Sequence, residues 1–130
     1  MSLNDPIGAA LSKIVNAEKI GNKECSIKFA GKLMKSIFDV MKDSKYIGSY
    51  QEIIDTRGNY LKINLLGNIN NCGVIKPRYP VKLDGYEKFE KRYLPAKDFG
   101  IIFVSTNQGI MTHHDAKKKN IGGKLIAFVY

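Results

Sequence analysis

The sequence predicts a mixed α+β fold, built either as one domain or as two small domains that share an interface. Segments with the three- and four-residue spacing of a helix alternate with short segments typical of strands. Hydrophobic residues make up 44% of the 130 residues, which is enough to bury a core. A polar, turn-forming segment at residues 67–71 is the best boundary in the chain, and it separates a domain 1–68 from a domain 69–130.

The N-terminal half is expected to hold two helices and three strands. Asp5-Pro6 is typical of a helix start, and Gly21-Asn22 is typical of a helix end. The expected elements are a first helix of about four turns between these signals, a strand at 25–29, a second helix at 31–43, and a hairpin of strands 46–55 and 60–66 around a turn at 57–59.

The C-terminal half is expected to be richer in extended segments. Pro77 and Pro80 exclude a helix from the first of them. Thr112 is followed three residues later by Asp115, a capping box that places a helix start at Thr112. The expected elements are an extended segment at 74–83, a short helix or turn at 86–93, a strand at 100–104, a helix at 112–120 and a last strand at 124–130.

The charge of the chain favours a polyanionic partner. The sequence has 21 lysines and arginines against 12 acidic residues, a net charge of +9, and the C-terminal half carries most of the excess. Such a field attracts RNA, DNA or an anionic membrane surface. The apolar runs are too short to span a bilayer, and no secretory signal is visible. We expect a soluble cytoplasmic protein without a membrane partner, with Cys25 and Cys72 as reduced thiols.

Catalytic and metal sites are not indicated. His113 and His114 are adjacent, so on a helix they point about 100° apart and cannot share a metal. No third ligand stands at metal-binding spacing nearby. Ser105 and Asp115 could supply the nucleophile and the acid of a catalytic triad with a histidine, but the sequence motif of a nucleophile elbow is not present. We expect no catalytic residue, no metal and no cofactor; a small RNA-processing enzyme that uses either histidine is an alternative.

A polar run that follows the strand at 100–104 is the strongest candidate for ligand binding. It consists of Ser105, Thr106, Asn107 and Gln108. An ordinary turn needs only two such residues, and these are the side chains that hydrogen-bond to 2′-hydroxyls, phosphates and base edges. Farther along, Gly122 and Gly123 either permit a bend before the last strand or let the backbone approach a ligand closely.

The sequence indicates RNA recognition through grooves and backbone rather than through base stacking. No predicted strand carries paired exposed aromatic residues, and there is no Gly-x-x-Gly clamp. Tyr86, Phe89 and Tyr93 recur at three- and four-residue spacing and are expected to face the core.

The two ends of the chain carry a family signature. The start "NDPIGAALSKIVNA" and the close "GIIFVSTNQGIMTHHDAKKKNIGGKLIAFVY" resemble universal small-subunit ribosomal protein eight, and the similarity covers essentially the whole chain. The middle stretch "VIKPRYPVKLDGYEKFEKRYLPAKDFGI" is similar to the archaeal and eukaryotic branch, of which we favour the archaeal.

The resemblance implies two small, closely packed α/β domains, each with a short, mostly antiparallel sheet and one or two helices. It also implies primary binding to the central domain of the small-subunit rRNA, at an irregular helix with an internal loop, and a role in assembling that domain. Other small-subunit ribosomal proteins are implied as partners of a chain that is a monomer when free. Some bacterial members repress their own translation, so the protein's own mRNA is a further candidate. A non-ribosomal RNA-binding adaptor is the second alternative.

The resemblance also assigns site residues. The family's Ser-Thr-Ser loop, which enters the minor-groove side, matches Ser105, Thr106 and Asn107, with a departure at the third position. The family's Gly-Gly pair matches Gly122 and Gly123, and Lys124 stands where many bacterial members have an acid. The predicted RNA-binding residues are Ser105, Thr106, Asn107, Gln108, Gly122, Gly123 and Lys124, with Asn4, Lys13, Lys32 and Arg57 as weaker candidates for backbone contacts.

Overall fold

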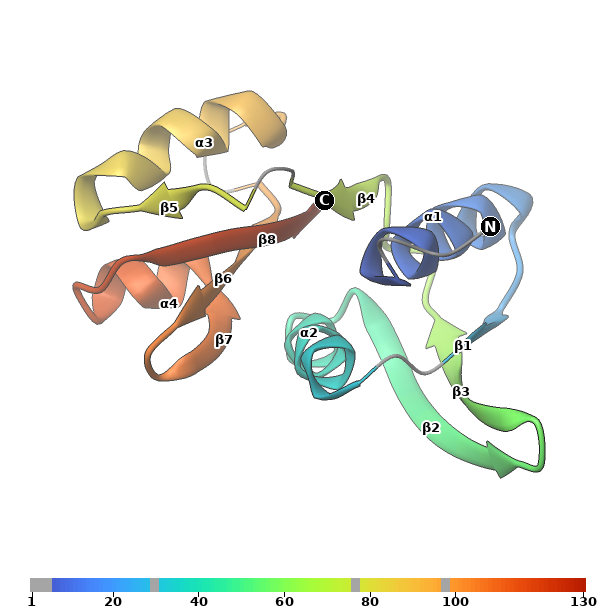
Figure 1. The fold of residues 1–130 in the computed structure, drawn as a ribbon. Helices are drawn as coiled ribbons and strands as arrows, with labels where there is room; N and C mark the ends of the chain where they lie inside the picture. The colour runs from blue at the N-terminus through green and yellow to red at the C-terminus, as the bar shows by residue number, and fades with distance from the viewer. Residues whose placement is uncertain (1–5, 29–30, 76–77, 97–98) are drawn as a thin grey trace. The chain divides into compact units, whose positions relative to one another are not determined.

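The computed structural model describes residues 6–28, 31–75, 78–96 and 99–130. The chain divides into two compact units, an N-terminal unit of residues 1–70 and a C-terminal unit of residues 71–130. Each unit combines helices with an antiparallel sheet, so the predicted mixed α+β class is confirmed (Figure 1). No helix in the described ranges is long and apolar enough to cross a membrane. Asn4, Asp5 and Pro77, which the sequence predictions single out, lie outside the described residues.

The N-terminal unit combines two helices with a three-stranded antiparallel sheet in the order β1-β3-β2. Its elements are α1 (Pro6–Ile20), β1 (Glu24–Lys28), α2 (Lys32–Asp43), β2 (Ile47–Asp55) and β3 (Gly58–Leu65). The predicted order is confirmed, but the hairpin turn is shorter than expected. Asp55 pairs directly with Gly58, so Thr56 and Arg57 alone form the turn.

The core of this unit lies between its helices and the sheet. α1 packs against β1 and α2 against β2, as the helical spacing of their apolar residues predicts. Leu61 and Ile63 of the central strand β3 are fully buried. The buried helical residues are Ile7, Ala10, Leu11, Ile14, Val15 and Ala17 on α1, and Met34, Ile37, Phe38 and Met41 on α2.

The C-terminal unit is built on an antiparallel sheet in the order β4-β8-β6-β7, with the short strand β5 also paired to β8. Two helices, α3 and α4, complete it (Figure 1). The elements are β4 (Cys72–Val74), β5 (Pro80–Val81), the 3₁₀ turn η1 (Leu83–Gly85), α3 (Tyr86–Tyr93), β6 (Ile101–Thr106), β7 (Gly109–Thr112), α4 (His113–Lys118) and β8 (Gly123–Val129).

The structure corrects the sequence prediction around the polar run. Ser105 and Thr106 belong to strand β6, and only Asn107 and Gln108 form a turn. Strand β7, which the sequence did not predict, returns alongside β6 and closes a β-hairpin. The physical reason is cross-strand pairing: a four-residue strand has little signal of its own and is stabilised by the ladder it joins.

Two further predictions in this unit are refined. The extended segment at 74–83 is broken into β4, β5 and the start of η1. The helix α4 begins after Thr112, whose hydroxyl oxygen accepts a hydrogen bond from the Asp115 backbone N–H at 3.1 Å, as the capping signal predicts. This helix ends at Lys118 rather than Asn120, because Asn120 takes a left-handed backbone conformation with φ of 58°.

Both helices of this unit contribute to one apolar cluster. Tyr86 and Phe89 of α3 are buried in it, as their spacing predicts, and Tyr93 packs at its margin. The fully or nearly fully buried members are Ile75, Val81, Tyr86, Phe89, Leu94, Ile102, Val104, Met111, Ala116 and Leu125.

Candidate nucleic-acid interface

The turn of the β6–β7 hairpin is fixed by the hydroxyl of Thr106. This hydroxyl donates a hydrogen bond to the Gly109 carbonyl at 2.8 Å and accepts one from the Gln108 backbone N–H at 3.1 Å. Gly109 has φ of 109°, a conformation that favours glycine. The side chains of Asn107 and Gln108 are exposed at the tip. Thr106 therefore holds the turn, and its two neighbours present amide groups to the solvent.

The start of β8 lies directly beside this hairpin. Ser105 pairs with Lys124 across the β6–β8 ladder. A Cβ atom on Gly123 would lie 2.3 Å from the Ser105 carbonyl oxygen, and one on Gly122 would lie 2.4 Å from the Val81 carbonyl oxygen. The two glycines are thus required where β8 enters between β5 and β6. This is a close approach of the chain to its own backbone, and the sequence had suggested only a bend or a ligand.

All seven main candidate residues gather at one end of the C-terminal sheet. The hairpin tip lies fourteen or more residues before the glycine pair and Lys124 in the chain, and the strand pairing β7-β6-β8 brings them together (Figure 1). We call this surface the hairpin edge. It consists of Ser105, Thr106, Asn107, Gln108, Gly122, Gly123 and Lys124.

The structure adds Lys82 to the hairpin edge. Lys82 follows β5 immediately, is exposed, and has its Cα 3.2 Å from the Cβ position of Gly122. Sequence reasoning missed it because it lies about 40 residues before the glycine pair, and the only link is the pairing of β5 with β8. Together with Lys124 it gives this end of the sheet two cations on the β8 side of the polar turn.

The segment that leads into the glycine pair is anchored from within the core. The hydroxyl of the buried Tyr86 donates a hydrogen bond to the Ile121 carbonyl at 3.0 Å. Burial raises the pKa of the Tyr86 phenol, so the group stays protonated and remains a donor. The Ile121 backbone N–H donates to the Ala116 carbonyl at 3.0 Å, which ties the same residue to α4. The glycine pair is therefore held by α3 and α4 as well as by the sheet.

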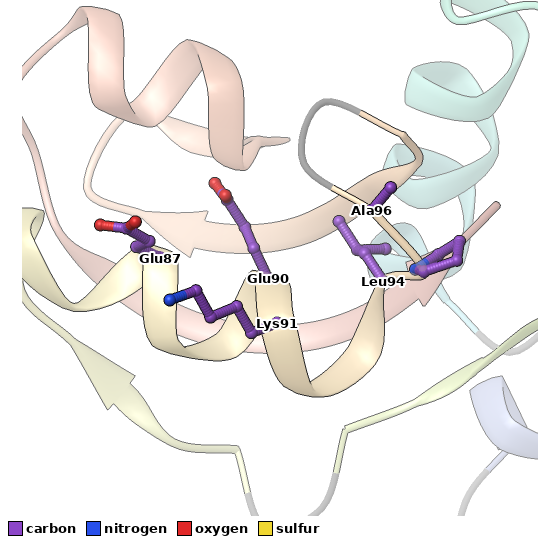
Figure 2. Close-up of a pocket in the computed structure, with 6 residues that line it drawn as sticks. Glu87, Glu90, Lys91, Leu94 and Ala96 are labelled. Carbon is purple, nitrogen blue, oxygen red and sulfur yellow. The ribbon is translucent and has the colours of Figure 1, made fainter.

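A buried polar cluster connects α3 to the start of α4. His113 is fully buried, and its Nδ1 accepts a hydrogen bond from the Ile102 backbone N–H at 3.0 Å. Its Nε2 lies 3.2 Å from Glu90 Oε1, within ion-pair distance but without the alignment of a full hydrogen bond. Lys117 pairs with the same carboxylate oxygen. Figure 2 shows the Glu90 side chain rising from α3 toward this cluster.

Burial sets the protonation state of His113. Desolvation first, and then the neighbouring His114, lowers the pKa of His113 to about 4, against the opposing effect of Glu90. The ring is therefore neutral at pH 7. Because Nδ1 accepts a hydrogen bond, the single proton is on Nε2, which faces Glu90. A fully buried neutral histidine between two helices and a strand is a structural residue, in agreement with the sequence interpretation.

The weaker candidates are not part of the hairpin edge. Lys13 on α1, Lys32 at the start of α2, and Arg57 in the β2–β3 turn are all exposed in the N-terminal unit, on three different elements. Asn4 lies outside the described residues. These residues share exposure and charge or polarity, and no contact in the described structure groups them into one site.

In the described part of the chain no metal centre stands out, and the pocket beside α3 is small. The pocket in Figure 2 has a volume of about 180 Å³, less than the roughly 300–1,000 Å³ typical of ligand sites. It is lined by Glu87, Glu90, Lys91, Leu94, Pro95 and Ala96. A pocket of about 430 Å³ lies in the N-terminal unit, away from the hairpin edge residues in sequence, and is lined by Glu18, Gly21, Asn22, Lys23, Leu65, Leu66 and Gly67. Among the described residues, no three His, Cys, Asp or Glu side chains are grouped to hold a metal ion.

Comparison with known families agrees with the signature at the two ends of the chain. The family model described as Ribosomal protein S8 matches residues 5–130. The chain therefore belongs to the ribosomal protein S8 family. This is a family of structural proteins of the small ribosomal subunit, not of enzymes, and its members bind small-subunit rRNA and other ribosomal proteins in the ribosome.

Proposed function

We propose that this protein is a primary rRNA-binding protein that recognises an irregular helix with an internal loop in the central domain of the small-subunit rRNA and helps to assemble that domain. The hairpin edge carries the proposal. It combines exposed amide side chains on a fixed turn with two exposed lysines that the glycine pair brings beside that turn. These groups suit the wide, shallow minor groove of A-form RNA, which displays 2′-hydroxyls and base edges.

The residues of the hairpin edge have different roles in this proposal. Asn107 and Gln108 are exposed at the tip and donate to and accept from the RNA directly. Thr106 is a positioning residue whose hydroxyl is already engaged by the turn, and Ser105 precedes it in β6, where it pairs with Ile110 and Lys124. Lys124 and Lys82 attract phosphates and add salt-dependent affinity. Gly122 and Gly123 let β8 enter between β5 and β6, which places Lys82 and Lys124 beside the hairpin.

The wider setting follows from the same proposal. The C-terminal domain, residues 69–130, carries the main RNA-binding loop, and the free protein is a monomer in the cytoplasm before it joins the ribosome. Other small-subunit ribosomal proteins are its neighbours there, and its own mRNA is a further candidate target. The middle stretch of the sequence resembles the archaeal and eukaryotic branch, and within that branch we favour an archaeal source.

The proposal is tested by a salt-titrated binding assay with two RNAs. One RNA is the central-domain hairpin with its internal loop intact, and in the other the loop is replaced by Watson–Crick pairs. We expect a preference for the intact loop of about 100-fold, equivalent to about 2.7 kcal/mol, that persists as salt rises. Equal affinities that fall together with salt would mean that only the net charge of the protein is recognised, and the proposal would be wrong.

A further inference from the structure

The helix α3 carries its charges on two separate sides. Glu87, Glu90 and Lys91 line the pocket of Figure 2, on the side that leads to the buried cluster with His113. Lys88 and Arg92 are four residues apart, a spacing that places both on another side of the helix. Both are exposed.

Lys88 and Arg92 rest on aromatic rings. The Arg92 guanidinium carbon lies 5.6 Å from the Tyr79 ring centroid and 5.7 Å from that of Tyr93. The Lys88 ammonium lies 5.9 Å from the centroid of Phe89. The rings support one another, with Phe89 5.3 Å from Tyr79 and 6.5 Å from Tyr93 between centroids. The attraction of a cation to a ring face fixes its position and, for Arg92, leaves N–H groups at the edge of the guanidinium plane free to donate.

The positive charge on this side of α3 has no acidic partner among the described residues. In the described part of the chain, no carboxylate forms an ion pair with Lys88 or Arg92, and the ion pairs of the C-terminal unit converge on Glu90 instead. Arg78 is exposed next to Tyr79 in the chain. A held guanidinium group without an acidic partner, as at Arg92, is suited to phosphates, which it binds in a bidentate manner.

This surface is continuous with the hairpin edge. The Tyr79 carbonyl accepts a hydrogen bond from the Leu125 backbone N–H at 3.0 Å, and Pro80 pairs with Lys124. The extended segment from Arg78 to Lys82 spans about 13 Å at ~3.3 Å per residue, and it connects the platform of rings to the lysines beside the glycine pair.

We infer that Lys88 and Arg92 form a second RNA-binding surface, the α3 basic face, which binds backbone phosphates of the helix that flanks the internal loop held at the hairpin edge. The inference rests on the proposed function, since it extends the path of the same RNA. The α3 basic face increases the affinity and lengthens the stretch of RNA that the protein contacts. The hairpin edge distinguishes the internal loop from a regular helix.

The test compares two RNAs that both contain the internal loop. The short RNA ends at the pairs that close the loop, and the long RNA extends the flanking helices by a further turn on each side. Arg92→Gln should weaken binding of the long RNA by about threefold to tenfold, reduce the slope of its salt dependence by about one, and leave the short RNA unchanged. Arg92→Lys keeps the charge but loses the planar stacked group, and we expect an intermediate effect on the long RNA alone.

Lys91→Gln is the matched control. It removes one positive charge from the adjacent position of α3, on the side of the pocket, and should alter binding of both RNAs by less than about twofold. If Arg92→Gln and Lys91→Gln have the same effect on the long RNA, the affinity does not depend on where on α3 the positive charge stands, and the inference is wrong. If Arg92→Gln weakens both RNAs equally, the effect is structural, and the inference is equally wrong.

Failure of the inference and failure of the proposed function have different signatures. The wild-type protein measured on looped and fully paired RNAs tests the proposed function, without any variant of α3. Suppose that the wild-type protein prefers the looped RNA and that Arg92→Gln binds the long RNA with unchanged affinity. The inference about the α3 basic face would then be wrong, and the proposed role of the hairpin edge would stand. Loss of incorporation into small subunits without any loss of RNA affinity would point to an acidic protein neighbour instead, and would overturn the inference.

Discussion

Gly123→Ala should destabilise the C-terminal unit, because the added methyl group has no room between β8 and β6. Its Cβ would lie 2.3 Å from the Ser105 carbonyl oxygen and 2.7 Å from Val104 Cγ1. Real Cβ contacts essentially never fall below 3.0 Å, so the strands would have to separate by at least about 0.7 Å at this point. The atom in the way is a backbone carbonyl in a hydrogen-bonded ladder, and it cannot rotate aside as the end of a flexible side chain could.

The cost can be estimated from two opposing contributions. Overpacking costs about 1–3 kcal/mol, and each ladder hydrogen bond that is weakened near the Ser105–Lys124 pair adds up to about 1 kcal/mol. Replacing glycine by alanine in a strand regains about 0.5–1 kcal/mol of backbone entropy. We therefore expect a net loss of about 2–3 kcal/mol in the free energy of unfolding.

Gly73→Ala provides the control in a strand of the same sheet. A Cβ on Gly73 would lie 3.4 Å from two ring carbons of Phe128, an ordinary van der Waals contact, so this variant should be within about 1 kcal/mol of wild type. Urea unfolding of both variants gives the comparison directly. Equal stabilities would refute the claim that the glycine pair is required by the approach of the strands, and would revive the view that its absent side chains serve the ligand alone.

Two further predictions concern single side chains. Thr106→Val removes the hydroxyl that holds the hairpin turn, so it should weaken binding of the looped RNA about tenfold and leave binding of a plain duplex unchanged. Thr106→Ser keeps a hydroxyl and should retain most of the affinity. Equal losses on both RNAs in a binding assay would contradict this prediction. The pKa of His113 falls from 6.5 in the unfolded chain to about 4 in the folded protein, so the folded state binds fewer protons between these pH values. The free energy of unfolding should therefore decrease as the pH falls from 6.5 toward 4, by at most about 3 kcal/mol. The free energy of unfolding, measured at a series of pH values, should show this decrease in wild type and in His114→Gln but not in His113→Gln. A decrease that persists in His113→Gln would mean that other groups cause it.

Local sequence signals were sufficient to predict the helices, whose start and end are marked by residues at their own termini. The first helix starts at Pro6 and stops before Gly21, and α4 is capped by Thr112, as predicted. Such signals act within a few residues, so the sequence contains all the information that they need. The buried faces of α1 and α2 follow equally directly from the spacing of their apolar residues.

Features that depend on pairing between distant segments could not be predicted in the same way. Strand β7 has four residues and β5 has two, and each exists only through its partner strand. The same limit hid Lys82 and the Tyr86 anchor, since both join the hairpin edge through contacts made 35 or more residues along the chain. The residue types at the candidate site were therefore recognised from the sequence, whereas the groups that position them were not.

The hairpin edge is rigid for reasons that bear on recognition. Its turn is closed by two hydrogen bonds of Thr106, its glycine pair is fixed between β5 and β6, and the segment before the pair is bonded to the buried Tyr86. The backbone of such a frame loses little freedom when its side chains bind, so more of the interaction energy is available for discrimination. Loops of the same composition would have to be ordered by the RNA and would fit many RNA shapes about equally well. The placement of polar residues at the end of a strand ladder thus favours recognition of one irregular helix over general attraction to RNA, and the Gly123 and Thr106 variants test the two ends of that frame separately.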